Sequence, residues 1–152
     1  MKNRVWILTA MVLVAVGARA QDDGLVNVRS QHDVATTVER LVEIVKKKGL
    51  KHFTTIDHAA GAKSVGATLA PTQLVLFGNP KIGTPLMNCG RTAAIDLPQK
   101  ALIWQAADGA VWVTYNDPAY LNSRHQLGDC EKVLMKVTGA LKGLTAYAAG
   151  AK

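Results

Sequence analysis

The sequence lacks the motifs that mark the common classes of hydrolytic enzyme. It contains no G-x-S-x-G elbow and no H-E-x-x-H stretch, and no acidic residues are paired for acid–base catalysis. Ser64 and Ser123 have no recognisable catalytic partners, and no two histidines show the i,i+4 spacing of a helical metal site. These absences favour a protein that is not an enzyme.

The sequence also lacks an apolar run long enough to span a membrane. The apolar run at residues 5–16 has twelve residues, whereas a transmembrane helix needs about 20. Lys2 and Arg4 precede it, and small residues at 17, 18 and 20 follow, a pattern typical of a secretory signal peptide cleaved after Ala20. We therefore expect one mature domain at residues 21–152, periplasmic or secreted, with no membrane segment after cleavage.

A strong charge of one sign is absent as well. Removing Lys2, Arg4 and Arg19 with the signal peptide lowers the formal net charge from +7 to +4. The remaining lysines are scattered except for residues 46–48, which precede Gly49 at an expected helix end, where cations are favourable. Nucleic-acid binding is therefore not expected.

Cysteine is scarce, with only Cys89 and Cys130. In an exported protein, two cysteines form a disulfide more often than a redox pair or a metal site. Closing a loop of that length stabilises by about 4 kcal/mol on the chain-entropy account. The spacing alone leaves the pairing open, because it does not show that the two sulfurs meet.

Hydrophobic periodicity predicts the element order β-α-β-β-α-β-β-α. The expected strands are residues 25–29, 50–57, 73–77, 101–107 and 110–115, and the expected helices are residues 34–48, 85–91 and 129–148. Asp33, Thr84 and Asp129 are the expected helix caps. Residues 58–66 suit a short helix or an irregular loop, and residues 119–125 suit a single helical turn. The order predicts an α+β fold, with an antiparallel or mixed sheet and helices mainly on one face.

Asp108-Gly109 predicts a two-residue hairpin turn. That turn would place Trp104 opposite Val113 and Gln105 opposite Trp112. One face would then carry Leu102, Trp104, Ala106, Val111, Val113 and Tyr115, and the other would carry Ile103, Trp112 and Thr114. An apolar outer face needs a cover, so we expect a homodimer or packing by the chain itself.

The stretch LVLFGNPKIGTPLM, residues 74–87, predicts a buried strand, a tight loop and a helix start. Its loop superficially resembles a phosphate-binding loop, but Thr84 stands where that motif has lysine, and Pro80 and Pro85 lack N–H donors. Two interpretations remain: helix N-terminal amides with Lys81 hold a small anion, or Gly and Pro simply shape the turn.

Six motifs occur in order along the chain, and together they resemble the family called domain of unknown function 302. They are Ile56–Ala60, Pro71–Leu74, Phe77–Pro80, Gly83–Met87, Ala94–Pro98 and Tyr115–Pro118. The resemblance covers about residues 28–148 and implies a two-layer, TATA-binding-protein-like fold that is often dimeric. It implies no known activity or cofactor. Cys89 and Cys130 are not part of the family's pattern.

Three hypotheses for function follow. The first is an exported binding module with a small polar or anion site, whose candidate residues are Asp57, His58, Asn79, Lys81, Gly83 and Thr84. The second is a metal or redox protein in which His58, His125 and Cys89, joined by Met87, hold a soft metal ion. The third is an interaction protein that assembles through the apolar hairpin face.

Overall fold

The computed structural model describes residues 23–151, so the predicted signal peptide at residues 1–20 lies outside the described part. Five strands form one sheet in the order β1-β5-β4-β3-β2, and every neighbouring pair is antiparallel. The strands are β1 (Leu25–Ser30), β2 (Lys51–Asp57), β3 (Thr72–Gly78), β4 (Gln99–Gln105) and β5 (Val111–Asn116). The predicted α+β class with helices on one face is confirmed.

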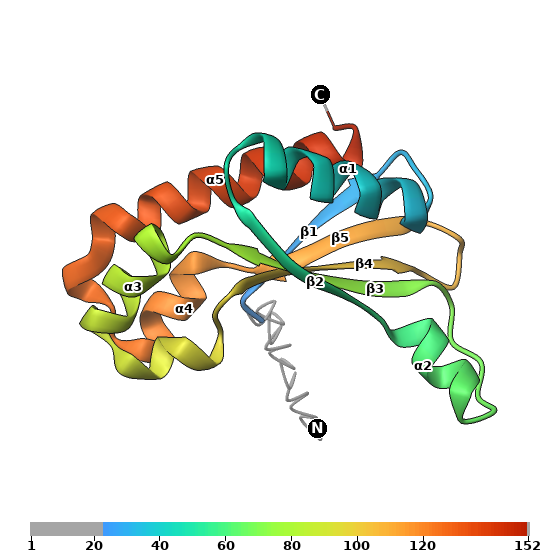
Figure 1. Ribbon diagram of the computed structural model, residues 1–152, viewed down its shortest axis with the longest axis horizontal. Coiled ribbons are helices and arrows are strands. Elements are labelled where there is room, and N and C mark those ends of the chain that lie inside the picture. The colour runs from blue at the N-terminus through green and yellow to red at the C-terminus, as the bar shows by residue number, and fades with distance from the viewer. Residues whose placement is uncertain (1–22, 152) are drawn as a thin grey trace, which may run out of the picture.

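Two long helices cover one face of this sheet, and the shorter helices lie at its ends (Figure 1). The covering helices are α1 (Val34–Lys47) and α5 (Glu131–Ala149). The short helices are α2 (His58–Ser64), α3 (Pro80–Cys89) and α4 (Pro118–His125), with the 3-10 turns η1 (Arg91–Ile95) and η2 (Gly128–Cys130). Residues 58–66 therefore begin as a helix, which decides between the two predicted alternatives.

The core lies between the two covering helices and the sheet. Its side chains come from the facing sides of the helices and the sheet, including Leu41, Val45, Val75, Ile103, Val113 and Leu141. Asp33 caps α1 by accepting the Thr36 N–H at 2.7 Å. Arg40 joins the two helices, because its guanidinium donates to the Tyr147 and Ala148 carbonyl oxygens at the α5 C-terminus. A cation at a helix C-terminus also favours the helix dipole.

The hairpin register differs from the predicted one by a single residue. Trp104 lies opposite Trp112, and Ile103 lies opposite Val113. The cause is a three-residue loop: Ala106 pairs with Ala110, and Gly109 takes the positive φ of +83° that such loops require. A shift of one residue in the pairing moves every side chain of β4 to the other face relative to those of β5. Ile103 is therefore buried beneath the helices, and Trp104 joins Trp112 on the opposite face.

Two predicted helix starts are also wrong. Helix α3 begins at Pro80 with Asn79 as its cap, because Asn is a strong cap and Pro suits the first helical position, so Thr84 and Pro85 lie inside the helix. Helix α5 begins at Glu131, after the 3-10 turn η2, and Asp129 does not cap it.

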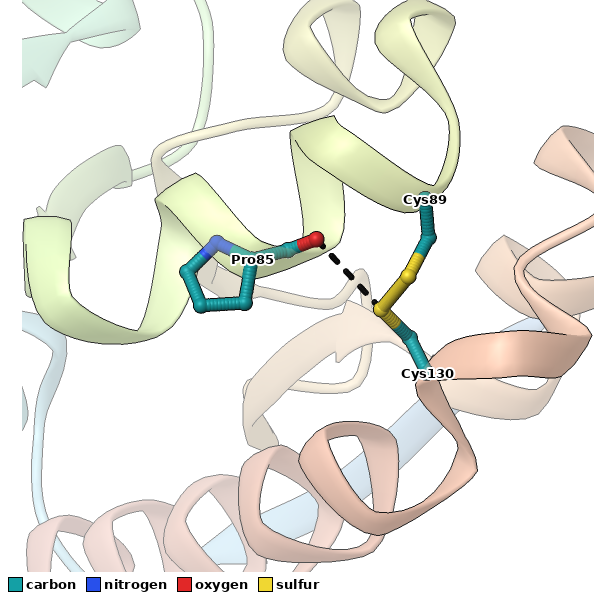
Figure 2. The surroundings of a disulfide bond; sticks show 3 residues. All are labelled: Pro85, Cys89 and Cys130. Atoms are coloured by element: carbon teal, nitrogen blue, oxygen red, sulfur yellow. Dashed lines mark hydrogen bonds between the residues drawn. A yellow bond between two sulfur atoms is a disulfide. The ribbon is translucent and has the colours of Figure 1, made fainter.

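Cys89 and Cys130 form a disulfide, with Cα atoms 6.2 Å apart (Figure 2). The bond joins the end of α3 to the residue before α5. The Pro85 carbonyl oxygen lies 3.3 Å from Cys130 Sγ, a close contact rather than a hydrogen bond, since a disulfide sulfur carries no proton. The disulfide thus fixes α3 against the long helix.

Candidate functional site

A cavity among the described residues lies at the end of β3, where the chain turns into α3. Its volume is about 710 Å³, and its walls come from α1, the β3–α3 corner, the start of β4 and one face of α5. The walls are mostly apolar, with Ile44, Leu50, Phe77, Ile82, Leu141 and Leu144 among them. Cavities of roughly 300–1,000 Å³ hold drug-sized ligands, so this one is large enough for a small organic molecule.

The cavity exists because α5 presents small residues along it. Gly139, Ala140 and Gly143 line the wall, and a Cβ atom added at either glycine would meet no other atom within 4 Å. Glycine inside a helix costs roughly 0.5–1 kcal/mol relative to alanine. The helix therefore gives up local stability at the two positions that leave the cavity open.

A second, smaller cavity of about 290 Å³ adjoins the first. The two share Gly78, Asn79, Ile82, Gln99 and Val137 as lining residues, so they form one continuous cleft around the β3–α3 corner. Among the sequence-predicted residues, Asn79, Gly83 and Thr84 line it. The corner therefore does border a cleft, but a mainly apolar one.

Gln99 stands out among the lining residues. Its Nε2 atom is buried and has no hydrogen-bond partner, the one such side-chain atom in residues 23–151. A buried donor without an acceptor costs about 1–3 kcal/mol. Because Gln99 borders both cavities, an oxygen atom of a bound molecule could accept this hydrogen bond.

The structure does not support the predicted anion site at the helix N-terminus. Pro80 has no N–H, the Lys81 N–H is bonded to Asn79 Oδ1, and the next two amides, of Ile82 and Gly83, donate to the Asn79 carbonyl oxygen at 2.9 Å. The first turn therefore has no free amide for an anion. The Lys81 side chain is exposed and lines neither cavity. Here the glycines and prolines shape the turn.

Asp57 and His58 lie at the other end of the sheet. Asp57 pairs with Gln73 near the start of β3, whereas Gly78, next to the cleft, pairs with Lys51. Strands rise about 3.3 Å per residue, so about 20 Å separates the two ends. Asp57 instead caps α2 by accepting the Ala60 N–H at 2.9 Å. The predicted pairing of His58 with the corner is wrong because it ignored the antiparallel direction of β2 and β3.

The predicted metal set is not assembled either. Cys89 is in the disulfide, and His58 lies at the distant end of β2. Both ring nitrogens of buried His125 are engaged: Nε2 lies 2.6 Å from Asp96 Oδ2, and Nδ1 lies 3.0 Å from Thr92 Oγ1. Met87 lines the smaller cavity. Within residues 23–151, no three His, Cys, Asp or Glu side chains are grouped to hold a metal ion.

Sequence reasoning missed the residues that define the cleft, namely Gln99, Lys48, Lys136 and the two α5 glycines. Lys48 follows the last turn of α1, and Lys136 lies on α5, so their proximity to one cavity depends on the packing of the two helices. The glycines could have been noticed in the sequence. Two glycines four residues apart in an apolar helix leave one face of that helix without side chains.

The one-sided sheet and the helices over it define a two-layer α+β protein. A solved structure with this fold, an uncharacterised conserved DUF302 protein from Bacillus stearothermophilus, aligns with a TM-score of 0.75 over 83% of this chain and 98% of that one. The two are 16% identical in sequence, so the likeness concerns the fold. The family described as "Domain of unknown function DUF302" matches residues 26–144, and the chain belongs to that family.

The curated relatives that match the chain are larger proteins. Two are named "Fluoride-specific ion channel FluC 1", from Brucella suis biovar 1 and from Brucella abortus biovar 1, and each is 50% identical over 131 residues. The match covers 85% of this chain but 51% and 48% of those relatives, so the chain spans about half their length. From residue 23 to residue 151, no helix has the length and apolar character needed to cross a membrane.

Proposed function

We propose that this protein is a non-enzymatic binding module that holds a small, largely apolar molecule in the cleft at the β3–α3 corner. The observation that carries the proposal is the 710 Å³ cavity with its apolar walls. A closely packed protein interior leaves few voids larger than a water molecule. A cleft of this size, beside a helix whose far end is held by a disulfide, suits a ligand.

A cavity-filling variant tests the proposal. Gly143→Leu adds a side chain where the cavity lies, and Gly61→Leu in α2 adds the same side chain at a helical glycine that also has nothing within 4 Å of its added Cβ. Titration calorimetry with decanol should show binding to the wild type and to Gly61→Leu. Binding to Gly143→Leu should be at least tenfold weaker. Equal binding by all three proteins, or no binding by the wild type, would contradict the proposal.

The names of the curated relatives suggest fluoride as another ligand. We expect no fluoride site at this corner, because the first-turn amides of α3 are already hydrogen-bonded within the chain. Fluorine NMR of fluoride ion titrated with the protein should show no saturable broadening. Broadening that Gln99→Leu abolishes would instead indicate an anion site in the cleft.

Export is part of the proposal, and it rests on the signal-peptide pattern at residues 1–20 together with a disulfide, which persists mainly in oxidising compartments. Expression of the full chain in a Gram-negative host, followed by osmotic shock, should release a protein that begins at Gln21. Recovery of uncleaved chain in the cytoplasmic fraction would contradict export.

The uncovered sheet face favours a second role, assembly of two copies. Trp104 and Trp112 lie side by side there, and Leu25 and Ile56 on the same face are 45% and 42% exposed. The polar groups beside Trp104 are paired, since Trp104 Nε1 donates to Thr114 Oγ1, which donates to Asn27 Oδ1. Arg29, which pairs with Trp112, and Thr54 are also exposed on this face, so its apolar surface is interrupted by polar side chains. A second copy of the chain would present the same apolar residues in return.

Light scattering after size-exclusion chromatography tests this pairing. Trp112→Glu should convert a dimer to a monomer, while Val65→Glu, at an apolar residue that is 80% exposed on another part of the molecule, should leave the dimer intact. A monomeric wild type, or a Trp112→Glu variant that stays dimeric, would rule out assembly through this face.

A further inference from the structure

The mouth of the cleft carries positive charge without matching negative charge. Lys48 and Lys136 line the cavity, and no Asp or Glu is among its lining residues. Neither ammonium group forms an ion pair with any residue from 23 to 151, where the ion pairs all involve Asp96. Lys48 caps the C-terminus of α1 and Lys136 lies on α5, and both line the same cavity.

The lysines near this mouth outnumber the acidic side chains. Glu43, one residue before the lining residue Ile44, is the acidic side chain tied to the cavity wall, because the Tyr147 hydroxyl donates to its Oε1 at 3.3 Å. Lys46 and Lys47 lie in the same last turn of α1 and add to the positive charge of Lys48. An anion at the mouth would therefore meet a field that attracts it.

We infer that the ligand of this cleft is a free amphipathic carboxylate, with its apolar body in the cavity and its anionic head between Lys48 and Lys136. This inference rests on the proposed binding function and specifies the chemistry of the ligand. The apolar walls exclude a purely polar anion, and the lysines disfavour a cationic amphiphile. Gln99 Nε2 provides a hydrogen-bond donor for one oxygen on the buried part of the ligand.

Three ligands with the same ten-carbon chain and different head groups provide the test. Decanoate, decanol and decylammonium are titrated separately into the full mature chain by calorimetry, below the concentrations at which they form micelles. We expect decanoate to bind most tightly and decylammonium least. A lysine–carboxylate contact near the surface is worth up to about 1 kcal/mol, so each lysine contributes about two- to fivefold in affinity.

Charge variants locate the head group. Lys48→Gln/Lys136→Gln should weaken decanoate binding about four- to twenty-fivefold, by the same estimate for two contacts, and should weaken decanol binding much less, because the decanol hydroxyl carries no charge. Lys142→Gln is the matched control, since Lys142 is an exposed lysine of the same helix that does not line the cleft. Added salt should reduce the affinity for decanoate more than that for decanol.

The possible results separate this inference from the function on which it rests. If decanoate and decanol bind equally and the double variant changes neither, the carboxylate is wrong and the apolar binding function stands. If none of the three ligands binds, both fail. If the protein co-sediments with phosphatidylglycerol vesicles but binds no free decanoate, the free amphiphile is wrong and the lysines recognise a membrane surface instead.

Discussion

At the scale of single residues, the best-defined polar contact is the one between His125 and Asp96. His125 is buried on α4, and its Nε2 lies 2.6 Å from Asp96 Oδ2, while Arg124 approaches the same oxygen at 3.5 Å. Thr92 completes the group at Nδ1. These contacts tie α4 to the segment after α3, so His125, which was proposed as a metal ligand, instead joins two elements at one end of the sheet.

Asp96→Ala should therefore destabilise the protein. It leaves a buried imidazole nitrogen without its partner, which costs about 1–3 kcal/mol. Urea denaturation should show this loss, whereas Asp129→Ala, at an exposed carboxylate of the same region, should change the unfolding free energy by less than about 0.5 kcal/mol. Equal effects from the two variants would mean that the His125–Asp96 contact carries no stability.

The α1 cap gives a prediction about pH. The backbone N–H of Thr36, then its side chain, hydrogen-bonds the Asp33 carboxylate and holds its pKa below the ordinary value of 3.8. A lowered folded-state pKa means that the stabilisation is present above 3.8 and is lost as the pH falls through the folded-state pKa. Asn also caps helices but does not titrate. The melting temperature of the wild type should therefore fall relative to Asp33→Asn as the pH drops below 3.8; parallel curves would contradict this.

At the scale of elements, the disulfide holds α3 in place. Cys89 and Cys130 are 41 residues apart, and the chain-entropy account gives about 4 kcal/mol for a loop of that length. Cys89→Ala/Cys130→Ala should lower the unfolding free energy by an amount of that order. Denaturation of the wild type with and without a reductant provides the control, since reduction removes the same bond and changes no side-chain volume. No loss in either experiment would mean that α3 is held by packing alone.

The errors in the predicted elements have local physical causes. Asp108-Gly109 indicates a hairpin, yet the same two residues fit either a two-residue turn or the last positions of a three-residue loop, and the choice moves every side chain to the other face. At α3, Thr84-Pro85 and Asn79-Pro80 are both cap-and-proline pairs. The chain uses the earlier pair because the helix can then start directly at the end of β3. The strands, the core helices and the fold class were predictable because each depends on the spacing of apolar residues along the sequence.

At the scale of the whole molecule, the sequence predicts a polar site at the strand–helix corner, whereas the structure has a mainly apolar cleft there. Residues 78–84 predict a site at a strand–helix corner, and Asn79, Gly83 and Thr84 line the smaller cavity there. That this corner binds a ligand stays a prediction. The larger cavity is apolar because Ile44, Leu50 and Leu144 line it. The spacing of apolar residues in the sequence assigns such residues to the core and does not show that they border a cavity. A cavity forms where side chains that are distant in the sequence leave part of the core unfilled. No single stretch of the sequence therefore predicts it.

The two glycines of α5 that line the cleft should lower the stability of the folded protein. Gly139→Ala/Gly143→Ala should raise the unfolding free energy by about 1–2 kcal/mol, because each glycine lies within a helix and an added Cβ meets nothing within 4 Å. For a domain of this size the melting temperature should rise by roughly 3–10 °C. Gly128→Ala, which also has room but lies in the 3-10 turn η2, is the control and should give a smaller change. If α5 needs its glycines for packing rather than for the cleft, the double variant will instead melt below the wild type.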